Sequence, residues 1–218
     1  MRRDGNFLQG LYYDDDREQF VESAGLYGES KVQWLDEVTD DDDGRILEPD
    51  TSTQDELAAQ YFGEGLSPRS ASEFIVLTWR EGKMFTLDRT SLEEQAEFEL
   101  PSGIAEGWGV TADETNVSDD GNYRLYVSDG SSSIFVLDGD TLTLQPDSTV
   151  TVKEGNTERD NINELEYVDG YIYANVWYQD ELLKIDPSNG AVVKKWDISS
   201  LAAAERKFQK AWKNGSTT

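Results

Sequence analysis

The 218-residue sequence contains neither cysteine nor histidine. Without cysteine there is no disulfide framework and no thiolate nucleophile, and without histidine there is no Ser-His-Asp triad and no zinc site of the usual histidine-bearing kinds. Proton transfer must therefore use Asp, Glu, Lys or Tyr side chains, and a metal site would need the oxygen ligands that suit calcium or magnesium. Two acidic runs, residues 14–16 and 40–43, are interpreted as solvated loops, with a weak surface calcium site as the alternative.

Basic residues and long apolar segments are also scarce. Only 19 Lys and Arg residues stand against 45 Asp and Glu residues, and the net charge is -26. We expect no nucleic-acid partner, because phosphate contacts require clustered basic side chains. No stretch approaches the ~18 apolar residues of a membrane span, and no apolar run near the N-terminus resembles a secretory signal. We therefore expect no membrane partner and keep the localisation open, with the secretory route as the expectation if a leader is missing from this sequence.

Apolar runs that end in an aspartate and a turn occur four times along the chain. The aspartates are spaced 52, 50 and 48 residues apart and are Asp36, Asp88, Asp138 and Asp186. Repeats of about 40 to 50 residues, each made of several short β segments, are typical of β-propeller blades. With 37% hydrophobic residues the chain can bury a core. We therefore predict an all-β propeller.

The last repeat shows the expected blade most clearly. It predicts a four-stranded antiparallel sheet from residues 163–168, 171–177, 181–185 and 191–198. Asp169-Gly170, between the first two strands, is a tight hairpin signal. The earlier repeats fit the same frame, with inner strands that begin at residues 7–11, 62–66, 107–110 and 162–165.

We expect a single propeller domain over residues 1–218, with the blade repeats at 7–198. Residues 40–56 are acidic and rich in Thr and Ser, and they are predicted to be an extended connection between the first two repeats. Residues 199–218 are predicted to be a tail with a short helix that Ser199-Ser200 could cap.

The repeat frame places residues of different blades at equivalent positions. The starts of the inner strands carry Gln9, Glu64, Trp108 and Asn163, and the positions nine residues before a closing aspartate carry Trp79, Asp129 and Trp177. An apolar box with a few polar groups is typical of a site for a small ligand. Packing between blades is the alternative role for each tryptophan taken alone.

Eight short motifs follow one another between Phe7 and Leu201. They are Phe7-x-Gln9-Gly10-Leu11, Glu22-Ser23-x-Gly25-Leu26-Tyr27-Gly28, Phe62-Gly63-Glu64-Gly65-Leu66, Thr78-Trp79, Gly107-Trp108-Gly109, Ser128-Asp129-Gly130-Ser131, Asn163-Glu164-Leu165-Glu166-Tyr167 and Ala174-Asn175-Val176-Trp177. In order and spacing these motifs resemble the glutaminyl-peptide cyclotransferases of the plant and bacterial type.

The resemblance implies a five-bladed β-propeller with acyltransferase activity. Such an enzyme converts the N-terminal glutamine of a peptide or protein to pyroglutamate and releases ammonia, without a catalytic zinc. The resemblance also implies further repeat sequence after the helix-like segment, including a motif of the type Thr-Gly-Lys-x-Trp whose lysine belongs to the site. This sequence stops before such a motif, so we expect about four repeats, with the last blade missing or incomplete. We expect no cofactor, although a structural calcium is compatible with the composition, and a monomer that acts on peptides or proteins with N-terminal Gln.

The site residues that the resemblance implies are one catalytic group and seven binding groups. The catalytic acid/base is Glu64, and the substrate-binding residues are Phe7, Gln9, Phe62, Trp79, Trp108, Asn163 and Trp177. The residues themselves support the role of Glu64, because aromatic neighbours would desolvate its carboxyl group and raise its pKa toward the working range. The alternative for Glu64 is a hydrogen bond to neighbouring backbone within the inner strand, and the alternative for Asn163 is strand capping.

Two other functional classes stay open at this point. One is a catalytically silent propeller that binds a small ligand or a peptide N-terminus through the same aromatic mouth. The other is a calcium-dependent, lactonase-like propeller, which predicts more acidic groups at the mouth than Glu64 and Asp129 provide. Loss of activity on chelation would distinguish the metal-dependent class from the cyclotransferase.

Overall fold

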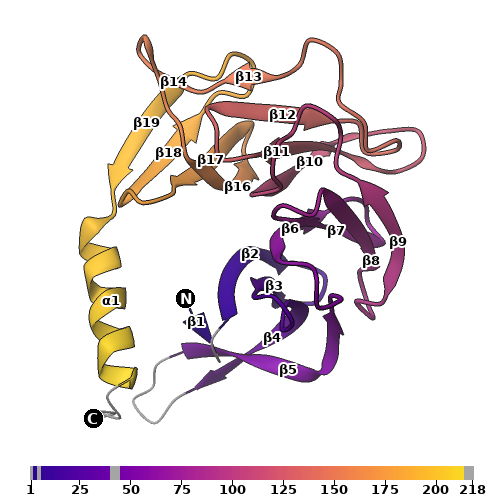
Figure 1. Cartoon of the computed structure of the whole chain (residues 1–218), viewed down its shortest axis with the longest axis vertical. Helices are drawn as coiled ribbons and strands as arrows, with labels where there is room; N and C mark the ends of the chain where they lie inside the picture. Colours follow the sequence, from indigo (N-terminus) through magenta and orange to yellow (C-terminus); the bar gives the residue numbers. More distant parts are fainter. Residues whose placement is uncertain (1, 4–5, 40–44, 214–218) are drawn as a thin grey trace.

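Four antiparallel sheets are arranged around a central axis like the blades of a propeller (Figure 1). The structure is a computed structural model and describes residues 2–3, 6–39 and 45–213. Each blade has four strands in chain order, and the first blade carries an additional two-residue strand. The prediction of an all-β propeller with four visible repeats is confirmed.

The strands follow the predicted blade frame from the first repeat to the last. The first two blades consist of β1 (Arg2–Arg3), β2 (Asn6–Asp14), β3 (Gln19–Gly25), β4 (Lys31–Thr39) and β5 (Arg45–Glu56), and of β6 (Gly63–Pro68), β7 (Glu73–Thr78), β8 (Lys83–Asp88) and β9 (Glu94–Glu99). The next two consist of β10 (Val110–Val117), β11 (Tyr123–Ser128), β12 (Ser133–Leu137) and β13 (Val150–Thr151), and of β16 (Ile162–Val168), β17 (Tyr171–Val176), β18 (Glu181–Ile185) and β19 (Val192–Asp197). A small hairpin of β14 (Lys153–Glu154) and β15 (Thr157–Glu158) connects them.

The first blade corrects one prediction. Residues 45–56, which were predicted to belong to an extended connection over 40–56, form β5 and pair with β4 as the outer strand of the blade. Residues 40–44 lie outside the described residues. An outer strand has one edge exposed to solvent, so an acidic, Thr-rich composition is compatible with it and does not distinguish it from a loop.

Three of the four repeated aspartates close their blades in the same way. The side chains of Asp88, Asp138 and Asp186 accept hydrogen bonds from backbone N–H groups two residues further along the chain, and those of Asp88 and Asp138 also from the N–H group three residues further along. Such turns are favoured by aspartate because its short side chain can replace a backbone acceptor. Asp36 is the exception: it lies inside β4, and its carboxylate accepts a hydrogen bond of 2.7 Å from Gln19 Nε2. The prediction of a turn at Asp36 is therefore wrong.

The hydrophobic core is divided into three clusters, each between two neighbouring blades. Val21 and Trp34 of the first blade pack with Phe74 and Val76 of the second. Equivalent clusters join the second blade to the third and the third to the fourth. Each blade is therefore stabilised mainly by the burial of apolar side chains against its neighbours.

The backbones of successive inner strands approach one another closely at glycines. A Cβ atom on Gly10 would lie 2.4 Å from Leu66 N, one on Gly65 would lie 2.6 Å from Val110 N, and one on Gly109 would lie 2.3 Å from Asn163 O. Atoms do not approach this closely without displacement, so only glycine fits these positions. Glycine therefore recurs where the inner strands of successive blades are closest.

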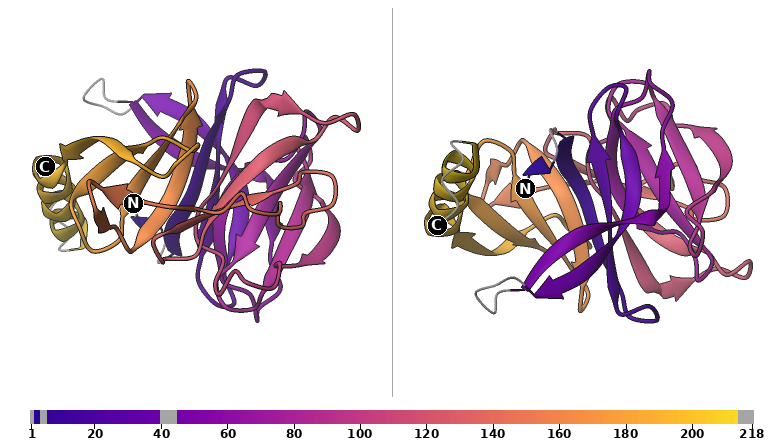
Figure 2. Two further views of the ribbon diagram at one scale, coloured as in Figure 1. Left: turned by 90° about the horizontal axis from the view of Figure 1, so that it is seen from above. Right: turned by 90° about the horizontal axis from the view of Figure 1, so that it is seen from below.

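The helix α1 (Ser199–Lys213) follows the last strand and lies beside the fourth blade at one end of the molecule (Figure 2). Its first turn begins with the hydrogen bond from Ala202 N to Ile198 O, and Asp197 accepts a bond of 2.8 Å from Ser199 N. Asp197, rather than the predicted Ser199-Ser200 pair, therefore supplies the side-chain acceptor. Among the described residues, no helix is long and apolar enough to cross a membrane.

Replacement of Gly65 by alanine is expected to lower the free energy of unfolding by about 2 to 4 kcal/mol, because the new methyl group would meet the backbone of the third blade. Gly63→Ala is the matched control on the same strand, since its nearest neighbour would lie 3.6 Å away, and it should cost less than about 1 kcal/mol. Urea unfolding followed by tryptophan fluorescence measures both. Equal losses in the two variants would contradict the contact at Gly65.

Candidate active site

Three inner strands carry a β-bulge at the equivalent position of their blades. The pairing register shifts between Leu8 and Gly10 in β2, between Gly63 and Leu66 in β6, and between Ile162 and Leu165 in β16. These shifts release Gln9, Glu64 and Asn163 from the regular ladder. A bulge can re-aim a side chain in this way, and here it does so at positions predicted to be functional.

Serines of the second strands hold the bulged segments of the following blades. Ser23 Oγ donates a hydrogen bond to the carbonyl oxygen of Glu64. Ser128 Oγ donates to Asn163 O at 2.6 Å and accepts a bond of 2.8 Å from Gly109 N. The backbone at the candidate site is therefore fixed by side chains from β3 and β11.

Glu64 is a buried carboxyl group next to an amide. Its exposed fraction is 7%, and Gln9 Nε2 donates a hydrogen bond of 3.3 Å to Glu64 Oε1. Burial, and after it the negative charges of Glu106 and Glu81, raises the pKa of Glu64 to about 9. The Glu64 carboxyl group is therefore protonated near neutral pH.

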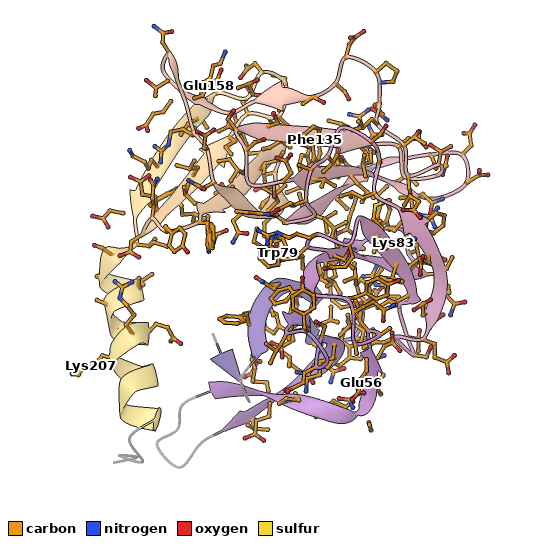
Figure 3. The ribbon with its side chains drawn as sticks, viewed as in Figure 1. Glu56, Trp79, Lys83, Phe135, Glu158 and Lys207 are labelled. Atoms are coloured by element: carbon orange, nitrogen blue, oxygen red, sulfur yellow. The ribbon has the colours of Figure 1, made fainter. Side chains whose placement is uncertain are left out.

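Five aromatic side chains contact one another in pairs and are called the aromatic wall below: Tyr27, Phe62, Trp79, Trp108 and Trp177. Glu81 and Glu106, whose charges act on Glu64, are hydrogen-bonded to this wall. Trp79, which follows β7, lies near the middle of the ring of blades (Figure 3). Its ring contacts Phe62 edge-on at a centroid distance of 5.7 Å, and Phe62 contacts Tyr27 at 5.4 Å. Glu81 supports this wall, since it accepts hydrogen bonds from Tyr27 Oη at 2.8 Å and from Phe62 N at 3.3 Å.

A second aromatic pair continues the wall into the third and fourth blades. Trp108 and Trp177 contact each other edge-on at 5.2 Å, and Trp177 is 43% exposed. The Nε1–H groups of Trp79 and Trp108 both donate to Glu106 Oε2, at 2.7 and 2.9 Å. One carboxylate thus joins the two aromatic pairs.

The other predicted residues take different positions. Asn163 lies against the third blade through its backbone, at the contact with Gly109, and Phe7 on β2 is 46% exposed. Asp129 stands nine residues before a closing aspartate, as Trp79 and Trp177 do. Its side chain accepts hydrogen bonds from the N–H and Oγ–H groups of Ser131 within its own turn. We therefore assign Asp129 to the turn.

A sequence model of the glutamine cyclotransferase family matches residues 3–217 of this chain. The chain belongs to the glutamine cyclotransferase family. Its resemblance to this family through the eight motifs is confirmed.

Two known cyclotransferases are similar to this member of the family. A glutaminyl-peptide cyclotransferase of Arabidopsis thaliana is 33% identical over 187 residues, which are 86% of this chain and 51% of the relative. The crystal structure of the Myxococcus xanthus glutaminyl cyclase superposes with a TM-score of 0.73 at 30% identity, over 91% of this chain and 74% of that one. The chain therefore spans about half the length of the curated relative that it matches.

A more distant structure shares the fold alone. Hydrazine synthase of Kuenenia stuttgartiensis superposes with a TM-score of 0.52 at 15% identity, over 89% of this chain and 50% of that one. The propeller by itself therefore says nothing about the reaction, and the function of the candidate site has to be argued from its own residues.

The candidate site contains acidic residues that the sequence analysis did not select. Glu106 has no acidic counterpart two residues before the other inner-strand positions, and Glu81 shares its position before the closing aspartate only with Glu29. The repeat frame therefore gave no reason to select them. Glu164 was noted only as part of a motif: its backbone N–H donates to Asn175 Oδ1 at 2.9 Å, and its buried Oε1 has no hydrogen-bond partner. Burial, followed by the charges of Glu166 and Glu64, raises the pKa of Glu164 well above its usual value.

The acidic side chains that the structure describes are not gathered at one point. Within residues 2–3, 6–39 and 45–213, no group of three or more His, Cys, Asp or Glu side chains is placed to hold a metal ion. In the acidic run at 14–16, the Asp14 carboxylate is paired with Arg89 at 2.7 Å and accepts backbone bonds from Asp16 and Arg17. Asp14 thus has a structural role that joins the first blade to the second.

Glu64→Gln is expected to raise the free energy of unfolding at pH 8 by on the order of 1 to 3 kcal/mol. The raised pKa means that the folded protein holds a proton that the unfolded chain releases. Stability is therefore complete below the usual pKa of 4.5 and is lost progressively as the pH rises toward about 9. Glutamine keeps an acceptor for Gln9 and has no charge to bury. Urea unfolding at pH 4 is the control, since both proteins are neutral at residue 64 there and should be equally stable; a less stable variant at pH 8 would contradict the buried neutral acid.

Proposed function

We propose that this protein is a glutaminyl-peptide cyclotransferase, which converts the N-terminal glutamine of a peptide or protein to pyroglutamate and releases ammonia. The observation that carries the proposal is the buried Glu64, protonated near neutrality, which accepts a hydrogen bond from the Gln9 amide and lies near two carboxylates that are hydrogen-bonded to the aromatic wall. Membership of the glutamine cyclotransferase family and the names of the similar proteins support the substrate.

The reaction needs one group that can give and take a proton. The α-amine nitrogen of the substrate attacks the γ-carboxamide carbon, and the bond from that carbon to the departing nitrogen breaks. The attacking nitrogen loses a proton and the departing nitrogen gains one, so the reaction releases neutral ammonia without net consumption of protons. Glu64 would enter as the neutral acid, donate its proton to the departing nitrogen and recover a proton from the attacking amine.

The surrounding groups would bind and fold the substrate. Phe62, Trp79, Trp108 and Trp177 offer apolar surface that can hold the glutaminyl side chain bent for ring closure. The Gln9 and Asn163 amides can orient the γ-carboxamide or polarise its carbonyl group. Phe7 extends this surface on β2. We propose that these seven residues bind the substrate.

The proposed reaction uses no cofactor. The step requires only proton transfer between nitrogen atoms and a carboxyl group, and a protonated Glu64 can supply it without a Lewis acid. The calcium-dependent lactonase-like alternative gains no support at the mouth, where Glu106 and Glu81 are hydrogen-bonded to the aromatic wall. The silent-binder alternative predicts peptide binding without turnover, which an activity assay decides.

Ammonia release from a peptide with N-terminal Gln tests the proposal. We expect turnover by the wild-type protein and a loss of about 10²- to 10⁴-fold in kcat for Glu64→Gln, because the amide cannot transfer the proton. The same peptide with N-terminal Asn is the control substrate, and circular dichroism checks that the variant is folded. Equal activity of the two proteins would contradict the role of Glu64, and a folded but inactive wild type that still binds the peptide would favour the silent binder. Inhibition by EDTA would point to the metal-dependent class.

The pH profile of kcat/KM is expected to be bell-shaped. The acidic limb reflects the substrate amine, which must be neutral to attack and has an ordinary pKa of about 7.7 to 8.0. The basic limb reflects Glu64, which loses its proton as the pH rises through about 9. Initial rates between about pH 6 and pH 10, a range that includes the pKa values of both groups, measure both limbs. Activity that rises steadily to the highest pH would contradict a protonated Glu64.

A further inference from the structure

Glu106 occupies the midpoint of the aromatic wall. It lies in the segment between β9 and β10, where Oε2 accepts the indole N–H bonds of Trp79 and Trp108, and Oε1 accepts a bond of 2.9 Å from Arg80 Nε. Trp79 belongs to the second blade and Trp108 leads into the third. A single carboxylate therefore sets the orientation of two rings that come from different blades.

We propose that Glu106 is a positioning residue of the cyclotransferase site, which aligns the Trp79 and Trp108 rings and holds a negative charge near Glu64. The proposal rests on the proposed function for its kinetic consequences. Its structural part stands independently, because an indole N–H group is a donor only and a partly buried indole requires an acceptor.

The bonds at Glu106 give it a different protonation state from Glu64. Burial works toward a higher pKa at Glu106, but hydrogen bonds from Trp108, Arg80 and Trp79, together with the positive charge of Arg80, lower the pKa below its usual value. The Glu106 charge in turn contributes, after burial, to the raised pKa of Glu64. The surroundings thus raise the pKa of one carboxyl group and lower that of the other. This difference is expected of a general acid and a neighbouring carboxylate that acts on it electrostatically.

The charged groups around Glu64 come from several elements. Glu106 lies before β10, Glu81 lies in the turn between β7 and β8, and Glu164 lies at the bulge of β16. The Glu81 carboxylate accepts hydrogen bonds from Tyr27 Oη and from the backbone N–H of Phe62. Glu106 differs from the other two because it accepts hydrogen bonds from two tryptophans of the wall, Trp79 and Trp108, so its replacement should change ring geometry and charge together.

Glu106→Gln tests both parts of the proposal on the full chain. The variant keeps the size of the side chain, removes its charge and replaces one acceptor oxygen by a donor NH₂ group. We expect kcat/KM for the peptide with N-terminal Gln to fall about 10- to 100-fold, because the rings no longer hold the substrate in register. The basic limb of the pH profile should move to lower pH by about one unit, because Glu64 loses a negative neighbour. Tryptophan emission should also change.

Two further variants separate geometry from charge. Glu106→Asp keeps the charge but is too short to reach both indoles, so kcat/KM should fall while the basic limb stays in place. Asp119→Asn is the matched control for the loss of one negative charge, since Asp119 is exposed in the turn at the far end of β10. It should leave the kinetics, the pH profile and the emission unchanged.

The outcomes distinguish this proposal from a purely structural role and from failure of the proposed function. A Glu106→Gln protein that is less stable but has an unchanged basic limb and unchanged emission would overturn the proposal. Arg80→Met, which keeps both indole bonds, should have a smaller effect; if it reproduces every effect of Glu106→Gln, the ion pair alone explains them and the proposal is wrong. If the wild type releases no ammonia, the proposed function fails, and the emission spectra of Glu106→Gln and Trp79→Phe still decide whether Glu106 holds the rings.

Discussion

The contact between the backbones of successive inner strands is the constraint on which the rest of the structure depends. Gly10 lies against Leu66, Gly65 against Val110, and Gly109 against Asn163, each with no space for a Cβ atom. At these points the blades are as close as their backbones allow. The three clusters of apolar side chains between the blades can close only at this separation, because larger inner residues would hold the sheets apart.

The candidate site is a consequence of the same crowding. The bulges beside these glycines release Gln9, Glu64 and Asn163 from the ladder, and Ser23 and Ser128 bind the carbonyl oxygens of the bulged segments. The reactive groups are thus carried by strands and not by long loops. Groups on rigid elements keep the short, fixed distances that proton transfer requires.

Local contacts, and not the net charge of -26, decide the state of each carboxyl group at the site. Glu64 and Glu106 lie in the same candidate site, but their surroundings differ. Glu64 is buried and accepts one hydrogen bond from the Gln9 amide, whereas Glu106 accepts three hydrogen bonds from indole and guanidinium donors. Exposed charges farther away are screened by salt, while buried neighbours are not. An acidic protein can therefore hold one neutral and one ionised carboxyl group in the same site.

The sequence by itself determined the propeller, the inner-strand stations and the candidates at them, because each depends on a pattern that recurs at a fixed spacing. Three of the four aspartate turns follow from that spacing, and so does the placement of Gln9 and Glu64 at equivalent positions of neighbouring blades. Tertiary structure alone decided that residues 45–56 are an outer strand, since the pairing with β4 leaves no periodic signal in an acidic segment of this kind. It alone also decided the role of Glu106, which has no acidic equivalent in other blades and contacts Trp79 only because the fold brings together residues that are 27 positions apart along the chain.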